Sequence, residues 1–141
     1  CNGIIDYFDD IYDHHFSKID NDQKLSKPKQ VAKLFRDHEI KLLKPLLEFL
    51  RGNSNCRLIG PGDNVLRAPT VAFVPKNKKP SEVARDLSKY NIMSGAGDFY
   101  AVRPLKALGI DPDEGVVRLS FVHYTSENEV KRLIEALEKI L

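Results

Sequence analysis

The sequence predicts an α+β domain in which a small, mostly antiparallel sheet has helices packed on one face. Segments with helical and strand-like patterns follow one another in the order helix, helix, strand, strand, helix, strand, helix, strand, helix. The first two strand-like segments are consecutive and could pair antiparallel, which favours this class over a parallel α/β sheet. The 141 residues are enough for one domain, and the hydrophobic fraction of 42% and the charged fraction of 30% are typical of a globular protein.

The first helix is predicted over residues 1–18, because apolar side chains recur at helical spacing from Ile4 to Phe16. Its other side carries aspartates at positions 6, 9, 10 and 13. The pattern starts at Cys1 without a capping residue or a methionine. We therefore expect this helix to lead in from a preceding large domain. The alternative is a chain that has lost a few residues at its start.

A second, longer helix is predicted after the polar stretch SKIDNDQKLSKPK. Pro28 suits the first turn of a helix, an apolar stripe runs from Val31 to Leu50, and Gly52 is a stop signal. Pro45 lies inside the stripe. An interior proline removes a backbone hydrogen bond and costs about 3 kcal/mol, so the pattern predicts a kink or a break near Lys41.

The remaining elements are shorter. Strands are predicted in NCRLIGP and APTVAFVP, separated by the turn GPGDN, and a short helix is predicted in PSEVARDLSKY. NIMSGAGDFYAV reads as a short strand that enters a glycine-bearing turn, and RPLKALGI as one or two helical turns ending at Gly109. After the turn DPDEG comes a strand in GVVRLSFV. Ser126 with Glu129 three residues later then forms a capping box for the last helix.

Charge, apolar runs and cysteine usage exclude several classes of protein. The net charge of +2 is too small to indicate a nucleic-acid partner. No apolar run reaches membrane-spanning length and no signal peptide is evident, so no membrane partner is expected. Cys1 and Cys56 show neither a metal-ligand spacing nor a disulfide framework, which favours a reducing, cytoplasmic compartment. We expect Cys56, at the start of a strand, to be buried and inert.

The histidines are predicted to be structural. His14 and His15 are adjacent, so they should point apart on a helix and cannot share a metal. His38 lies on the apolar stripe and is expected at the edge of the core, whereas His123 follows a strand and is expected to make a structural hydrogen bond. No set of His, Asp and Glu residues has the spacing of a metal site or a catalytic triad. The sequence therefore assigns no metal and no catalytic residue to this chain.

Arg118 interrupts an otherwise half-buried strand. Val117, Leu119 and Phe121 fall on one face of that strand and should meet the core. Arg118 and Ser120 fall on the other face. Because arginine is mostly exposed in proteins, the strand alone favours an ordinary surface residue.

Three segments together resemble the C-terminal part of class V aminotransferases, most closely the cysteine desulfurase-like proteins. They are RDHEIKLLKPLLEFLR, GAGDFYAVRPLKALGI and GVVRLSFVHYTSENEVKRLIEALEKIL. The last is the most specific, with an arginine and a serine in a strand, a tyrosine and a threonine after it, and then a capped helix. The resemblance implies pyridoxal phosphate chemistry on the type I aminotransferase fold, with residues 1–141 as the small C-terminal domain of a longer enzyme.

The resemblance also implies roles for particular residues. Arg118 matches the family's arginine that holds the substrate α-carboxylate, and the planar fork of a guanidinium fits a carboxylate with two parallel hydrogen bonds. Gly97, Asp98 and Tyr100 would belong to an active-site loop. The lysine that holds the cofactor would lie in the preceding large domain, so the isolated chain is expected to hold no cofactor and to be inactive. The implied partners are that large domain, a second copy in a homodimer, and an amino-acid substrate.

The loop departs from the family pattern. Desulfurases carry a cysteine in the pattern Gly-x-x-Cys-Ala, and here Tyr100 stands in its place between Gly97 and Ala101. A phenol cannot accept a persulfide sulfur as a thiolate does, so transamination, racemisation or another lyase reaction stays open. A further arginine common in that loop is replaced near Gly95. The alternative function is a stand-alone, non-catalytic interaction module that uses the sheet face or the loop with Lys76, Lys78 and Lys79.

Overall fold

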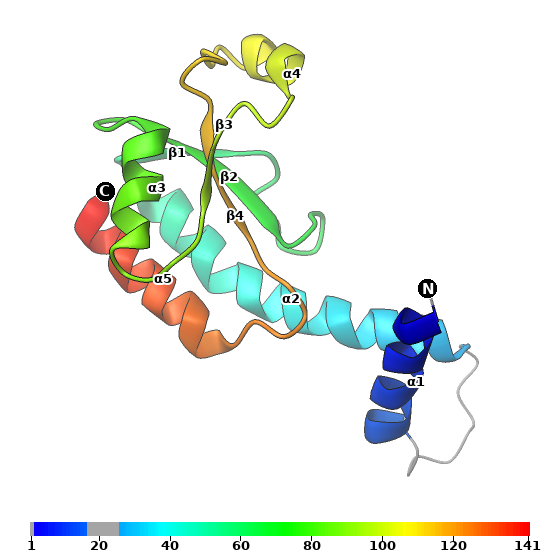
Figure 1. The fold of residues 1–141 in the computed structure, drawn as a ribbon. Helices are drawn as coiled ribbons and strands as arrows, with labels where there is room; N and C mark the ends of the chain where they lie inside the picture. The colour runs from blue at the N-terminus through cyan, green and yellow to red at the C-terminus, as the bar shows by residue number, and fades with distance from the viewer. Residues whose placement is uncertain (1, 17–25) are drawn as a thin grey trace.

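The computed structural model describes residues 2–16 and 26–141, and its elements follow the predicted order (Figure 1). They are α1 (Asn2–Phe16), α2 (Lys27–Gly52), β1 (Cys56–Ile59), β2 (Thr70–Pro75), α3 (Pro80–Ser88), β3 (Gly95–Gly97), α4 (Val102–Ala107), β4 (Val116–Ser120) and α5 (Glu127–Ile140). The predicted α+β class is confirmed. Residues 1, 17 and 18 of the predicted first helix lie outside the described residues.

The described strands form one four-stranded sheet in the order β1-β2-β4-β3, and every pair is antiparallel. The predicted pairing of the first two strands is confirmed. Strand β4 lies between β2 and β3, with Phe73 opposite Val117 on one side and Gly95 opposite Arg118 on the other. Strand β3 is an edge strand of only three residues, which suits its composition of two glycines and an alanine.

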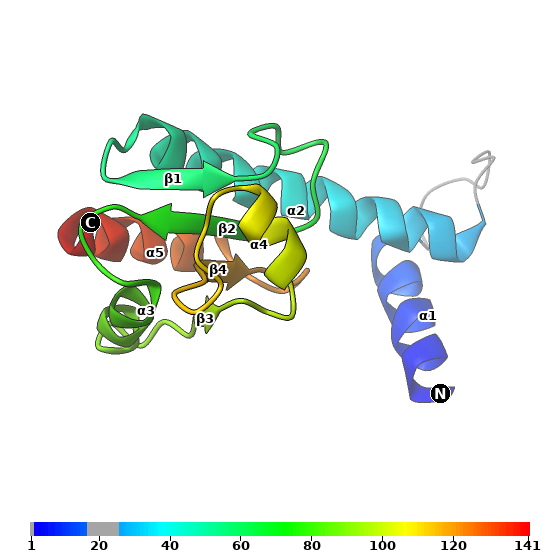
Figure 2. The ribbon, with the colours of Figure 1, turned by 90° about the horizontal axis from the view of Figure 1, so that it is seen from above.

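The main core lies on one face of this sheet. Val117, Leu119 and Phe121 all point into it, as predicted, and are at most 8% exposed. Helices α2 and α5 cover this face, and α3 closes the core next to β3 (Figure 2). Burial of large apolar side chains from the sheet and from three helices is the main contribution to stability.

A second, smaller apolar cluster lies on the opposite face, beneath α4. Leu105, Ile110 and Val116 are its buried members, and Ala72 and Phe99 pack against it. The prediction placed helices on one face only, but α4 covers the Val116 end of the other face. Arg118 and Ser120, further along β4, stay exposed on that face.

The break predicted near Lys41 does not occur, because α2 runs without interruption through Pro45. Burial outweighs the local cost of the proline. Each fully buried leucine stabilises the fold by about 1.5–3 kcal/mol, against about 3 kcal/mol for an interior proline. The buried leucines of α2 are Leu42, Leu43, Leu46, Leu47 and Leu50. One turn before the proline, the carbonyl of Ile40 also accepts a hydrogen bond from Asn64 Nδ2 at 3.0 Å.

The start of α5 matches the predicted capping box. The backbone N–H of Glu129 donates to Ser126 Oγ at 3.2 Å, and the backbone N–H of Ser126 donates to Glu129 Oε2 at 2.7 Å. The hydrogen bonds from Ser126 lower the pKa of the Glu129 carboxyl. This reciprocal pair orients α5 directly after β4.

Within the described residues, no helix is both long and apolar enough to cross a membrane.

Helix α1 packs against the N-terminal part of α2, away from the sheet (Figure 1). Tyr12 is its buried residue, at 8% exposed, and Phe8 meets Phe35 of α2 edge to face with ring centroids 5.7 Å apart. Ile4 and Ile5 remain 66% and 61% exposed. The apolar residues of α1 are therefore only partly covered by the rest of the chain.

Helix α1 should depend on this docking, since an isolated 15-residue helix is marginal in water. We expect Tyr12→Ala to remove most hydrogen-exchange protection from Asn2–Phe16 while leaving the amides of α5 protected. Ile5→Ala is the matched control, because it truncates an exposed residue of the same helix, and should change little. Hydrogen exchange followed by mass spectrometry at two protein concentrations is the measurement. Wild-type protection that appears only at the higher concentration would show that α1 is covered by self-association instead.

Candidate functional site

Arg118 lies in the middle of β4, on the face opposite the main core, and is exposed. Its neighbours across the sheet are Ala72 in β2 and Gly95 in β3. Neither neighbour has a side chain beyond Cβ, so nothing on the adjacent strands at this level crowds the guanidinium. A central strand gives Arg118 a rigid base, while small flanking residues leave space around its head group.

Phe99 is the side chain that contacts Arg118. The guanidinium carbon of Arg118 lies 3.9 Å from the centroid of the Phe99 ring, a cation–π contact. At an exposed site such a contact contributes about 0.5–1 kcal/mol. Phe99 itself is half-buried and also packs against the small cluster beneath α4. The ring therefore links the arginine to the apolar support on this face of the sheet.

The charge of Arg118 is not neutralised within the described part of the chain. There it forms no ion pair and no hydrogen bond through its side chain. Arg67 differs, because its guanidinium donates to the backbone carbonyls of Pro61, Ile59 and Thr70, and burial lowers its pKa. Arg67 has a structural role, whereas the N–H groups of Arg118 are available to an anion from outside the chain.

The loop after β3 has an unusual backbone. Phe99 and Tyr100 are consecutive non-glycine residues with positive φ, at 49° and 61°, and Gly97, two residues before Phe99, has φ 138°. Left-handed conformations cost a non-glycine residue about 1–3 kcal/mol each and are common at functional sites. The loop thereby turns Phe99 toward the sheet, while the Tyr100 side chain is fully exposed.

The structure brings together only part of the predicted site. Arg118 and the predicted loop of Gly97, Asp98 and Tyr100 are adjacent in the fold, because β3 pairs with β4. Phe99, for which the sequence predicted no role, is the loop residue that contacts the arginine. Asp98 is half-buried and forms no ion pair with Arg118 among the described residues. The sequence did carry a signal for this role of Phe99, because it is an aromatic residue that follows the glycines of an edge strand. Aromatic side chains often cover such glycines.

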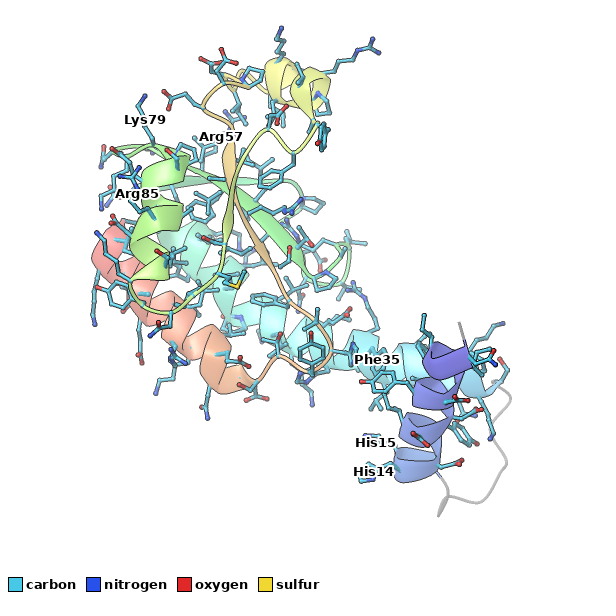
Figure 3. The ribbon with its side chains drawn as sticks, viewed as in Figure 1. His14, His15, Phe35, Arg57, Lys79 and Arg85 are labelled. Carbon is cyan, nitrogen blue, oxygen red and sulfur yellow. The ribbon has the colours of Figure 1, made fainter. Side chains whose placement is uncertain are left out.

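Two histidine predictions are confirmed and one is wrong. His38 is half-buried with Nε2 2.7 Å from the Thr125 carbonyl, and His123 Nε2 hydrogen bonds with the Tyr7 hydroxyl at 2.6 Å. His14 and His15 do not point apart, since their rings meet edge to face with centroids 4.8 Å apart (Figure 3). Rotation about their side-chain bonds brings the rings together although the α-carbons are about 100° apart around the helix. Within residues 2–16 and 26–141, no group of three or more possible ligands could hold a metal.

Cys56 is buried, as predicted. Its side chain is 7% exposed and its Sγ donates to the Leu50 carbonyl at 3.5 Å. Burial raises the pKa of the Cys56 thiol, which favours the unreactive protonated form. Cys56 is a structural residue and not a substitute for the cysteine that the loop lacks.

The lysine loop after β2 is partly neutralised by carboxylates. Lys78 forms an ion pair with Asp86 at 3.1 Å, and Lys79 forms one with Glu114 at 2.9 Å. The Glu114 carboxylate raises the pKa of Lys79. These pairings reduce the positive charge that a nucleic acid or another large anion would encounter.

Replacement of Phe99 and Tyr100 with glycine should separate backbone strain from side-chain packing. Tyr100→Gly relieves one left-handed residue and removes an exposed side chain, so we expect the free energy of unfolding to rise by up to about 1 kcal/mol. Phe99→Gly relieves the backbone in the same way but loses the ring contacts, so we expect the free energy of unfolding to fall by about 1–2 kcal/mol. Urea denaturation of both variants is the measurement. A destabilised Tyr100→Gly would show that Tyr100 makes contacts that stabilise the loop.

Comparisons with known proteins agree with this fold. A sequence model of the family described as aminotransferase class-V matches residues 29–133. The aminotransferase-like protein FGM3 of Gibberella zeae is 32% identical over 117 residues, which are 81% of this chain and 29% of that protein. A probable cysteine desulfurase of Pseudomonas putida is 29% identical over 102 residues, which are 72% of this chain and 24% of that protein.

A solved structure from the same group of proteins is also similar to this chain. The apo structure of a cysteine desulfurase from Thermococcus onnurineus is similar with a TM-score of 0.69 and 29% identity, covering 81% of this chain and 28% of that one. The chain thus spans 24% to 29% of the length of these relatives. The family match extends over most of the chain, from α2 into α5, and includes the strand that carries Arg118 and the loop that carries Phe99. The chain belongs to the class V aminotransferase family.

Proposed function

We propose that this chain is the C-terminal small domain of a pyridoxal-phosphate-dependent enzyme, and that Arg118 binds the α-carboxylate of its amino-acid substrate. One observation carries the proposal. The exposed Arg118 guanidinium sits on a central strand, is stacked by Phe99, and has no acidic partner among the described residues. Such a group can offer a carboxylate two parallel hydrogen bonds without first giving up an internal ion pair.

The chain covers only 29% of the FGM3 protein and 28% of the archaeal desulfurase. This low coverage supports a larger enzyme of which the chain is one part. We propose that a large domain precedes the chain and that residues 1–18 lead in from it. The uncovered residues Ile4 and Ile5 of α1 support a contact with that domain or with a second copy in a homodimer. The free Cys56 thiol is compatible with the cytoplasmic location proposed for the enzyme.

The residues of this chain do not by themselves fit attachment of the cofactor. The family is pyridoxal-phosphate-dependent in general, and such enzymes hold the cofactor through a lysine. Every lysine in the described ranges is exposed, and Lys78 and Lys79 are occupied in ion pairs. We propose that the attachment lysine lies in the preceding domain, and that this chain contributes substrate binding.

The loop limits the reactions that fit. Tyr100, in the place of the desulfurase cysteine, presents a phenol to solvent, and Cys56 is buried in the main core. Persulfide formation on this chain is therefore disfavoured. Transamination, racemisation or another lyase reaction on an α-amino acid fits these residues. The alternative of a stand-alone interaction module is weaker, because ion pairs with Asp86 and Glu114 occupy two lysines of the loop that it would use.

The cofactor proposal predicts weak and unselective binding by the isolated chain. After incubation with pyridoxal phosphate and borohydride reduction, we expect no single lysine to be labelled preferentially, since no described lysine lies in a buried pocket. Absorbance spectra and peptide mapping by mass spectrometry are the measurements. A stable yellow adduct on one specific lysine would contradict the assignment of the attachment lysine to a preceding domain.

The carboxylate proposal predicts that Arg118 matters for catalysis and little for folding. Arg118→Gln or Arg118→Leu should change the free energy of unfolding by no more than about 1 kcal/mol, because Val117 and Leu119 anchor the strand. In the intact enzyme, Arg118→Gln should lower kcat/KM by the equivalent of about 2–3 kcal/mol for substrates with an α-carboxylate. Arg118→Lys should retain only part of the wild-type kcat/KM, because an ammonium cannot reproduce the planar fork of the guanidinium.

Thermal melting of the chain and steady-state kinetics of the intact enzyme measure these effects. Arg103→Gln is the matched control, because it removes another exposed arginine, in α4, and should leave both quantities near wild type. An unfolded Arg118→Gln chain, or unchanged amino-acid turnover by the intact variant, would make Arg118 a structural or ordinary surface residue.

A further inference from the structure

Gly95, Phe99 and Arg118 form a three-residue arrangement at the edge of the sheet. Gly95 lies directly opposite Arg118 in the β3–β4 pair. A Cβ atom added to Gly95 would lie 2.9 Å from Cζ and 3.0 Å from Cε1 of Phe99. The ring therefore occupies the space that a side chain at position 95 would need, and from there it stacks on the guanidinium.

The backbone of the loop maintains this placement of the ring. Phe99 adopts φ 49°, which is uncommon for a bulky residue. Its ring gains burial against the cluster of Leu105, Ile110 and Val116, and it gains the contact with Arg118. The neighbouring Tyr100 has a similar φ without burial of its side chain. The contacts of Phe99 therefore favour this loop conformation, together with the turn hydrogen bond that the Ala101 N–H donates to the Asp98 carbonyl at 2.8 Å.

Stacking and carboxylate binding use different parts of a guanidinium. The five N–H donors lie in its plane and point outward from its edge, whereas an aromatic ring contacts its face. Phe99 has no oxygen or nitrogen acceptor that would occupy the N–H donors of Arg118, and no ion pair occupies them among the described residues. A carboxylate side chain in place of Phe99 would instead occupy those donors and compete with a substrate.

We propose that Phe99 is a positioning residue for the amino-acid substrate: it stacks on the face of Arg118, restricts its rotamers, and directs its N–H edge toward the incoming α-carboxylate. Gly95 is the residue that makes room for the ring. This inference rests on the proposed carboxylate role of Arg118. Because the arginine is held before the substrate arrives, less side-chain entropy is lost on binding, and the affinity for the carboxylate rises.

The stacking can be tested on the 141-residue chain by NMR of the Arg118 side chain. We expect the ring to shift the Arg118 side-chain resonances upfield and to limit motion of the Nε–H bond. Phe99→Leu should remove the shift and lower the order parameter to about 0.6 or below, the range of flexible groups. Gly95→Ala should do the same with Phe99 still present, because its Cβ displaces the ring. Phe99→Tyr keeps a ring and should retain both signals.

Tyr90→Leu is the matched control for these spectra. It removes another ring that faces a cation, with Lys139 Nζ 5.7 Å from the ring centroid, and should leave Arg118 unchanged. Gly95→Ala also provides the test if Phe99→Leu fails to fold. Wild-type Arg118 signals in both Phe99→Leu and Gly95→Ala would overturn the inference.

The substrate role is tested on the intact holoenzyme, with L-alanine and L-cysteine as probes and their α-carboxamides as comparison. We expect Phe99→Leu to raise the half-saturating concentration of the amino acids about 2- to 5-fold, as the loss of an exposed cation–π contact predicts. The carboxamides should be unaffected, Phe99→Tyr should restore binding, and Phe99→Leu should add nothing to Arg118→Gln. If Arg118→Gln strongly raises the half-saturating concentration of the amino acids but Phe99→Leu leaves it at the wild-type value, the inference about Phe99 is overturned. The proposed function of Arg118 is then unaffected. No effect of Arg118→Gln on the amino acids overturns the proposed function and, with it, the substrate role of Phe99.

Discussion

Side chains along β4 alternate between the main core and the opposite face, and this alternation determines where the candidate site lies. Val117 and Leu119 are buried in the main core, so Arg118 and Ser120 must face the other way. A slip of one residue would place a cation in the core and expose two apolar side chains. Because β4 pairs with β2 on one side and β3 on the other, this register also determines which residues flank the arginine.

The face that carries Arg118 has a packed apolar end and an exposed polar end. Helix α4 and the apolar cluster around Val116 cover one end, and the same cluster supports Phe99. The loop between β3 and α4 adopts two left-handed residues in succession and so returns the Phe99 ring to the sheet. Packing on one half of the face thus positions the charged group on the other half.

The chain matches only part of the length of its relatives. It belongs to the class V aminotransferase family and spans 24% to 29% of the relatives compared with it. Its described lysines are exposed, whereas Arg118 is available to an anion from outside. These properties fit a domain that holds a substrate against a cofactor bound elsewhere, which is the function proposed for it.

Features that depend on neighbouring residues could be predicted from the sequence. Periodicity predicted the order of the elements and the inward face of β4, and the spacing of Ser126 and Glu129 predicted the capping box. Other features depend on contacts between distant parts of the chain and became clear from the fold. Pro45 stays inside α2 because the helix buries leucines in the core, and Phe99 rather than Tyr100 meets Arg118 because β3 pairs with β4 through a glycine. Because such contacts join residues far apart in the chain, no local sequence pattern contains their energies.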